Sequence, residues 1–313
     1  MRRHGLRARA FARCAHGPAV KQIVMHAQTP PVNPRQPPCA RSAAAVLGLI
    51  WACALPHSTW AGEVRGAAFQ HTPSSQVALV AEANVALPAT SGSPGFFGKW
   101  HDIPATSRPP VPVVLFLHGS SGLGLKAIED WQRWLAELGI ASAAPDSFAL
   151  PDRLTYDSPV DKEVYERIHA LRASEIELAS AALRSATWAD PTRLVLAGTS
   201  EGAVAVARHS GAGFVGRMLF SWSCEDNYFV DGHRTAIPPD QPALNVISAS
   251  DPFFSLHNKA LGNPHALGHC GEALRDNKNA TIVLIPGASH TLLNLPAARH
   301  AASGFLGDVF MVH

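Results

Sequence analysis

Acidic residues are missing from the first 61 residues of this 313-residue chain, although that segment contains eight lysines or arginines. Setting the segment aside leaves 18 basic and 24 acidic residues, so the remainder has a formal charge of −6 while the whole chain carries +2. The remainder therefore lacks the basic surplus with which nucleic-acid-binding proteins hold phosphates. We expect no nucleic-acid partner.

A hydrophobic run long enough to span a bilayer comfortably is also lacking, because the apolar run at residues 43–55 is too short. Arg35 and Arg41 precede this run, and a small-residue site at 59–61 follows it, as in an export signal cleaved before Gly62. We expect a leader at residues 1–61, with Met25 a possible true start, and a mature domain at 62–313. The protein would then be periplasmic or secreted. An uncleaved N-terminal anchor and lipidation at Cys53 are the alternatives.

Cysteines are few: five in all, of which Cys14, Cys39 and Cys53 fall in the leader. Only Cys224 and Cys270 remain, an even number that suits one disulfide in an oxidising compartment. Two separate buried thiols are the alternative, because spacing alone does not show whether two Cα atoms are close enough for a bridge.

Strand-like and helix-like segments alternate along the rest of the chain. A continuous apolar run predicts a buried strand at 113–117, and further strands are expected at 140–144, 194–197, 217–222, 243–249 and 280–285. Helical spacing appears at 126–138, after Asp161 and at 297–312, while residues 76–87 alternate as in an edge strand or hairpin and 91–112 resemble a loop. This order predicts an α/β fold with a mostly parallel sheet, helices on both faces and a single domain. A functional site is expected at the carboxyl ends of the strands.

The sequence G-T-S-E-G at 198–202 lies between the strand predicted at 194–197 and a small-residue helical stretch at 203–208. A strand, a sharp turn with a serine at its apex and a helix form the nucleophile elbow of serine hydrolases. The flanking glycines remove Cβ atoms where the strand and helix backbones crowd together, so that Ser200 can expose its hydroxyl in a strained conformation.

Serine needs a base to accept its proton and an acid to orient that base. Asp251 follows the strand predicted at 243–249, and His290 follows the strand predicted at 280–285. With Ser200 they give the chain order Ser, Asp, His of the α/β hydrolases. A single histidine near a strand end is weak evidence in a chain with 16 histidines. Glu225 and Asp226, which follow the preceding strand, are the rival acids.

The sequence H-G-S-S-G at 118–122 follows the strand predicted at 113–117. We expect the backbone N–H of Ser120 to act with that of Glu201 as an oxyanion hole. A role for the Ser120 side chain remains open. Five aromatic residues are candidates for the substrate pocket, and the alternative is that they pack the core: Phe148, Tyr156, Trp222, Phe253 and Phe254. Residues 226–241 are long enough to form a lid.

Taken together, several motifs resemble those of the α/β hydrolase superfamily, in its dienelactone hydrolase-like branch. They are L-H-G-S-S-G at 117–122, Trp131 and Trp134, G-I at 139–140 with P-D-S-F at 145–148, G-T-S-E-G at 198–202, Asp251 and His290. The resemblance covers residues 76–306. True dienelactone hydrolases have cysteine at the nucleophile position, so Ser200 favours a general serine hydrolase of small-molecule esters, esterase- or lactonase-like.

The resemblance implies acyl transfer through an acyl-enzyme, without a metal or organic cofactor. Exported peptidases or amidases of the same fold, and a non-catalytic ligand-binding protein, are alternatives. A further alternative is a dinucleotide site, because G-L-G-L-K-A at 122–127 fits that fingerprint with Asp146 about 20 residues further on. The four residues between the predicted strand and these glycines count against it. No oligomeric state follows from the sequence.

Overall fold

Eight strands form one sheet in the computed structural model of the chain, in the order β10-β9-β8-β7-β4-β5-β2-β3. β2 runs antiparallel to both of its neighbours, β3 and β5, and the remaining pairs are parallel. A separate two-stranded sheet pairs β1 (Val64–Arg65) with β6 (Thr155–Tyr156). The bounds of the eight strands are β2 Asn84–Leu87, β3 Phe96–Lys99, β4 Val111–Leu117, β5 Ala141–Ala144, β7 Ala189–Thr199, β8 Gly216–Phe220, β9 Ala243–Ser248 and β10 Ala280–Ile285.

The structure describes residues 62–105 and 107–311. The expected export signal, the possible start at Met25 and the lipidation candidate Cys53 all lie outside these residues. No helix in the described ranges combines the length and the hydrophobicity needed to cross a membrane.

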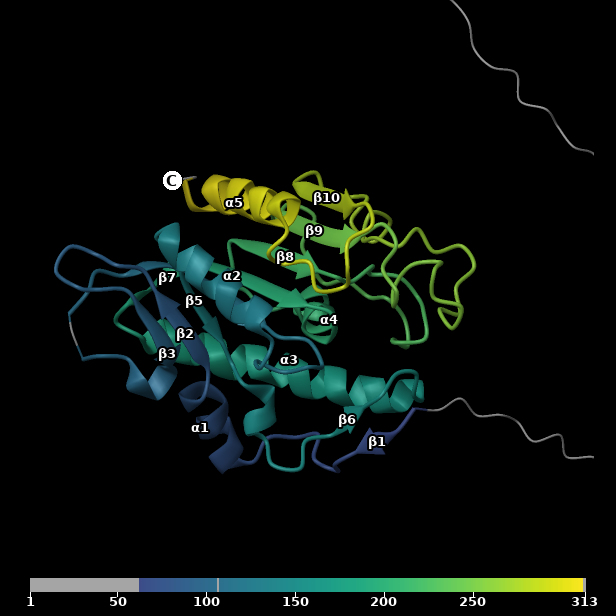
Figure 1. Ribbon diagram of the computed structural model, residues 1–313, viewed down its shortest axis with the longest axis horizontal. Helices are drawn as coiled ribbons and strands as arrows, with labels where there is room; N and C mark the ends of the chain where they lie inside the picture. The colour runs from purple at the N-terminus through teal and green to yellow at the C-terminus, as the bar shows by residue number, and fades with distance from the viewer. Residues whose placement is uncertain (1–61, 106, 312–313) are drawn as a thin grey trace, which may run out of the picture. The chain divides into compact units, whose positions relative to one another are not determined.

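Helices cover both faces of the large sheet (Figure 1). α3 (Lys162–Ser185) and α4 (Glu201–Arg208) pack on one face, and α1 (Pro73–Ala81) lies against α3. α2 (Lys126–Glu137) and α5 (Pro296–Met311) pack on the other face. Two short 3₁₀ helices, η1 (Trp100–Asp102) and η2 (Ser147–Ala149), lie in connections. This arrangement confirms the predicted α/β fold with a mostly parallel sheet.

Side chains of the central strands alternate between two hydrophobic cores. In β4, Leu115 and Leu117 belong to the core beneath α3 and α4. Val114 and Phe116 point to the other core, where the Phe116 ring lies 4.9 Å from the ring of Trp131 in α2. Because both faces of the strand are covered, its sequence is a continuous apolar run instead of an alternating one.

Two predictions about the N-terminal part of the sheet were wrong. Residues 76–81 are helical, because Thr72 and Ser75 form reciprocal capping hydrogen bonds and Pro73 occupies the first helical position of α1. The segment at 91–112, expected to be a loop, contains β3 at the edge of the sheet. The alternation at 76–87 therefore described a strand only in its last four residues, β2.

The nucleophile turn forms where α4 passes very close to the ends of β4 and β7. A Cβ atom added to Gly202 would lie 2.3 Å from the carbonyl oxygen of Leu117 and 2.7 Å from that of His118. A Cβ atom on Gly198 would lie 2.7 Å from the carbonyl carbon of Gly202. These are backbone atoms at the end of β4 and in α4, which are packed together and have little room to move. The expected crowding of strand and helix backbones is present at both glycines.

We expect Gly202→Ala to lower the free energy of unfolding by about 3 kcal/mol, because the new methyl group must push α4 away from the end of β4. Chemical denaturation would measure the change. Gly307→Ala is the matched control, since position 307 lies in α5 and a Cβ atom there meets nothing within 4 Å. It should be neutral or stabilising by up to about 1 kcal/mol. Equal losses in the two variants would contradict the crowding argument.

Candidate active site

Ser200 stands alone between the end of β7 at Thr199 and the start of α4 at Glu201. Its backbone angles, φ 54° and ψ −119°, lie in a region that non-glycine residues rarely adopt, at a cost of about 1–3 kcal/mol. The Ser200 amide donates to the carbonyl of Phe220 (2.9 Å), and its carbonyl accepts from Ala203 (3.0 Å). Its side chain does not cap α4. The hydroxyl is therefore presented at a turn that the surrounding backbone holds in place.

His290 and Asp251 form a hydrogen-bonded pair, with 2.8 Å between His290 Nδ1 and Asp251 Oδ2. Asp251 is fully buried, and its Oδ1 accepts the backbone N–H groups of Phe253 (2.9 Å) and Phe254 (3.0 Å). These bonds hold the carboxylate in one orientation. When Nδ1 donates to Asp251, Nε2 of His290 is left to accept a proton.

The loop that carries His290 is attached to the ends of two neighbouring strands. Ser221, directly after β8, donates its hydroxyl to the carbonyl oxygen of His290 (2.5 Å). Ser248, the last residue of β9, donates to the carbonyl oxygen of Ala288 (2.7 Å). The imidazole is thus positioned by the same sheet edge that carries Ser200.

The two rival acids have other partners. Glu225 accepts hydrogen bonds from the backbone N–H groups of Leu267 (2.5 Å) and Gly268 (2.9 Å), which fixes the loop after β9. Asp226 pairs with His233 at 3.1 Å, and its side chain is 63% exposed. The geometry brings only Asp251 of the three carboxylates to His290.

Backbone N–H groups of Ser120 and Glu201 donate no hydrogen bond to any acceptor in the described part of the chain. Ser120 and Ser200 line one pocket, and Glu201 is the first residue of α4. Donors free of protein partners beside a nucleophile have the chemistry of an oxyanion hole.

The Glu201 side chain is buried, although acidic residues at helix N-termini are commonly exposed. Arg153 donates to Glu201 Oε1 through Nη2 (2.7 Å), and the Tyr156 hydroxyl donates to Oε2 (3.0 Å). The carboxylate of the residue after the nucleophile is thus held on both oxygens.

A second buried arginine fixes the loop at 118–122. Arg172 donates through Nη2 to the carbonyl oxygen of His118 (2.8 Å) and pairs through Nη1 with Glu175 (2.8 Å). Burial alone would raise the pKa of Glu175, but Arg172 and hydrogen bonds from His71 and Ser147 outweigh it and lower the pKa to about 2. Glu175 is therefore ionised at neutral pH, as the pairing requires.

Burial, reinforced by Arg172, lowers the pKa of His118 well below its ordinary value, so the ring is neutral. Its Nε2 accepts the backbone N–H of Ser147 (3.1 Å), and Nδ1 therefore carries the proton and donates to the carbonyl oxygen of Gly119 (2.6 Å). Together with the bond from Arg172, these contacts hold the carbonyl groups of His118 and Gly119, the two residues before Ser120, in place.

Ser200 and His290 open into a pocket of about 250 Å³. Of the five aromatic pocket candidates, Phe253 lines it, with its ring 4.6 Å from that of His290. Phe148 and Trp222 do not line it. Phe148 is 41% exposed and lies under the guanidinium of Arg153, whereas Trp222 is buried behind the pocket wall, 4.8 Å from the ring of Phe254.

Tyr156 and Phe254, the remaining candidates, both line the pocket. Sequence reasoning missed Tyr228 and Phe229, which also line it and come from the segment 226–241 that was considered only as a lid. Two adjacent aromatic residues in a loop after a strand end were the available signal.

Cys224 and Cys270 form a disulfide. It joins the loop after β8, which contributes Tyr228 and Phe229 to the pocket, to the loop after β9, which contributes Phe253 and Phe254. The two aromatic walls of the pocket are therefore covalently linked.

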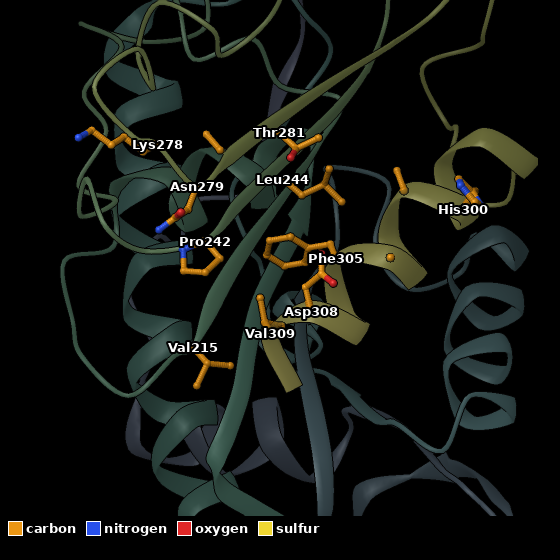
Figure 2. Close-up of a pocket in the computed structure, with 13 residues that line it drawn as sticks. Val215, Pro242, Leu244, Lys278, Asn279, Thr281, His300, Phe305, Asp308 and Val309 are labelled. Carbon is orange, nitrogen blue, oxygen red and sulfur yellow. The ribbon is translucent and has the colours of Figure 1, made fainter. Parts of the chain in front are cut away.

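A larger cavity of about 750 Å³ lies away from these residues (Figure 2). It is lined by α5 residues such as Phe305 and by residues at the starts of β8, β9 and β10, including Val215, Pro242 and Asn279. The amino ends of the strands thus form it, whereas Ser200 and its partners follow their carboxyl ends.

The alternative dinucleotide residues, Gly122, Gly124 and Asp146, line a separate hollow of about 350 Å³. Residues 118–125 separate β4 from α2, whereas the fingerprint requires glycines in the turn directly after the strand. Across residues 62–105 and 107–311, no group of three His, Cys, Asp or Glu side chains is placed to hold a metal ion.

No family model matches the chain, and no curated protein matches its sequence. Its structure is similar to several solved structures. A dienelactone hydrolase-like promiscuous phosphotriesterase, P91, from metagenomic libraries has 16% identity and a TM-score of 0.47, covering 73% of this chain and 98% of that one. Est1E from Butyrivibrio proteoclasticus has 16% identity, a TM-score of 0.45 and coverages of 73% and 93%. TT1662 from Thermus thermophilus has 19% identity, a TM-score of 0.48 and coverages of 66% and 92%.

We expect the double variant Cys224→Ala, Cys270→Ala to lose about 2–5 kcal/mol of unfolding free energy, because the bridge closes a loop with a sequence separation of 46 residues. Thermal or chemical denaturation of the oxidised protein and the variant would measure this. Adding reductant should destabilise the wild type towards the variant and leave the variant unchanged. A wild type indifferent to reductant and equal in stability to the variant would show that the bridge does not contribute.

Proposed function

We propose that this protein is a serine hydrolase that cleaves carboxylic esters through an acyl-enzyme, with Ser200 as nucleophile, His290 as base and Asp251 as the acid that orients it. The observation that carries the proposal is Ser200 in a strained turn, in the same pocket as a histidine hydrogen-bonded to a buried aspartate. No rival carboxylate in the described part of the chain pairs with that histidine.

In the proposed reaction, Ser200 Oγ attacks the ester carbonyl while His290 Nε2 accepts its proton. Asp251 stabilises the imidazolium and keeps its Nδ1 proton in place. The developing oxyanion accepts hydrogen bonds from the backbone N–H groups of Ser120 and Glu201. His290 then protonates the leaving alcohol, and water, activated by the same histidine, hydrolyses the acyl-enzyme.

A fluorophosphonate probe should label the purified protein stoichiometrically, because it phosphonylates only an activated serine. Ser200→Ala should abolish labelling and lower kcat/KM for para-nitrophenyl acetate by about 10³-fold or more. Ser174→Ala is the control, since Ser174 lies on the outer surface of α3. The Ser174→Ala protein should be labelled, and should be active, to the same extent as the wild type. Intact-protein mass spectrometry gives the stoichiometry.

Persistent labelling in Ser200→Ala would overturn the assignment of the nucleophile. Absence of labelling in a folded wild type would favour a binding protein over an enzyme. Parallel assays with para-nitrophenyl acetate and acetyl para-nitroanilide distinguish an esterase from an amidase of the same fold, and we expect turnover of the ester only.

We also propose that the protein is exported and acts in the periplasm or outside the cell. The basic and apolar pattern of residues 35–61 and the Cys224–Cys270 disulfide support this, because disulfides persist in oxidising compartments. Expression of the full chain in a bacterium should give a periplasmic or secreted protein whose N-terminus is Gly62. Recovery of the uncleaved chain from the membrane fraction would indicate an anchor instead.

A further inference from the structure

No aspartate, glutamate, lysine or arginine is among the described residues that line the pocket around Ser200. Its ionisable side chains are His290 and two tyrosines, Tyr156 and Tyr228. Burial, followed by the nearby Glu201 carboxylate, raises the pKa of Tyr156 well above its ordinary value, and burial likewise raises the pKa of Tyr228. Both phenols are therefore neutral at physiological pH, and the wall contains no lysine or arginine that could pair with a substrate carboxylate.

Two arginines lie behind this wall, but neither is free to bind substrate. Arg153 is only 5% exposed and donates to Glu201, Ser147 and the carbonyl of Leu154. Arg172 is fully buried and is occupied by Glu175 and His118. The guanidinium groups of Arg153 and Arg172 face the carboxylates of Glu201 and Glu175, so this four-residue cluster carries no net formal charge.

Tyr156 separates this cluster from the pocket. It lines the pocket while its hydroxyl donates to Glu201 Oε2 (3.0 Å). Turning either arginine toward a substrate would break a buried ion pair, which typically costs 3–5 kcal/mol. The neutrality of the pocket is thus fixed by buried ion pairs that are costly to break.

Aromatic rings brace one another around the opening. The ring centroid of Phe229 lies 6.1 Å from that of Tyr156 and 5.4 Å from that of Phe254. The rings of Tyr228 and Phe254 are stacked, with 6.4 Å between their centroids. The enclosed volume of about 250 Å³ is below the range of about 300–1,000 Å³ of sites for drug-sized ligands. Because these aromatic side chains pack against one another, they enclose a small space with apolar walls, which suits a planar ring of a substrate.

We propose that the site selects small, uncharged esters that carry an aromatic ring, and that it rejects esters with a carboxylate on that ring. This inference rests on the proposed function. A carboxylate in the pocket would lose its hydration without gaining a cation, which is a large penalty. A neutral ring loses little hydration and gains contact with the aromatic walls.

The test compares matched substrate pairs. For the acyl side, the pair is para-nitrophenyl benzoate and para-nitrophenyl para-carboxybenzoate; for the alcohol side, it is phenyl acetate and para-acetoxybenzoate. Each kcat/KM is divided by the hydroxide-catalysed rate of the same ester. We expect each anionic ester to fall at least about 100-fold below its neutral partner. Para-nitrophenyl cyclohexanecarboxylate, with a puckered ring, should fall below the benzoate.

A charge introduced at the rim tests the cause. Leu125 lines the pocket and is 37% exposed, so a longer polar side chain can be accommodated there. Leu125→Lys should raise the anionic-to-neutral ratio of kcat/KM about tenfold for at least one pair, whereas Leu125→Gln, of similar length without charge, should not. High salt should reduce the gain in the lysine variant.

The inference is overturned if the wild type cleaves anionic and neutral partners at similar rates, if the cyclohexane ester matches the benzoate, or if the lysine and glutamine variants behave alike. In each of these cases, labelling of Ser200 by the fluorophosphonate probe would leave the proposed function standing. If no ester is cleaved and Ser200 is not labelled, the proposed function fails and this inference fails with it.

Discussion

The crossing of α4 over the ends of β4 and β7 is the constraint on which the site depends. Position 202 has room only for hydrogen, because the carbonyl oxygens of Leu117 and His118 lie directly against it. That proximity forces the chain to turn sharply at Ser200, whose positive φ is stable only because its amide and carbonyl are both hydrogen-bonded to packed neighbours. The strained serine, the free N–H of Glu201 and the start of α4 all follow from one packing requirement.

Buried ion pairs fix the relative positions of the two segments that carry the candidate oxyanion donors, the loop after β4 and the start of α4. Arg172 binds the carbonyl of His118, and Arg153 with Tyr156 binds the carboxylate of Glu201. Burying two arginines and two glutamates returns little net stability, since desolvation offsets most of their attraction. What the cluster does achieve is a fixed separation between the loop after β4 and the first turn of α4. Donors that need no rearrangement when charge develops are the most effective kind.

The sequence predicted the parts of the molecule that depend on local pattern. Buried strands such as β4 and β9, the long α3 and the geometry of the turn at Ser200 follow from apolar runs, periodicity and glycine spacing. α1 was missed because residues 76–87 were interpreted as an alternating strand pattern and Thr72 was not recognised as a capping residue. The Glu201–Arg153 contact could not be foreseen, since its partners are 48 residues apart and charged residues are normally expected on the surface. The same holds for Trp222, whose burial depends on rings contributed by distant loops.

In the proposed reaction, substrate selection and proton transfer depend on the same property of the pocket. Five aromatic side chains and no lysine, arginine or carboxylate line the pocket, which lowers the effective dielectric beside Ser200 and His290. The attraction between the Asp251 carboxylate and an imidazolium formed at His290 is strongest under those conditions, and Asp251 is fully buried with its second oxygen already satisfied. A cation in the wall would favour anionic substrates but would disfavour the imidazolium. Keeping Arg153 and Arg172 occupied behind Tyr156 is therefore consistent both with the proposed base, His290, and with the proposed choice of substrate.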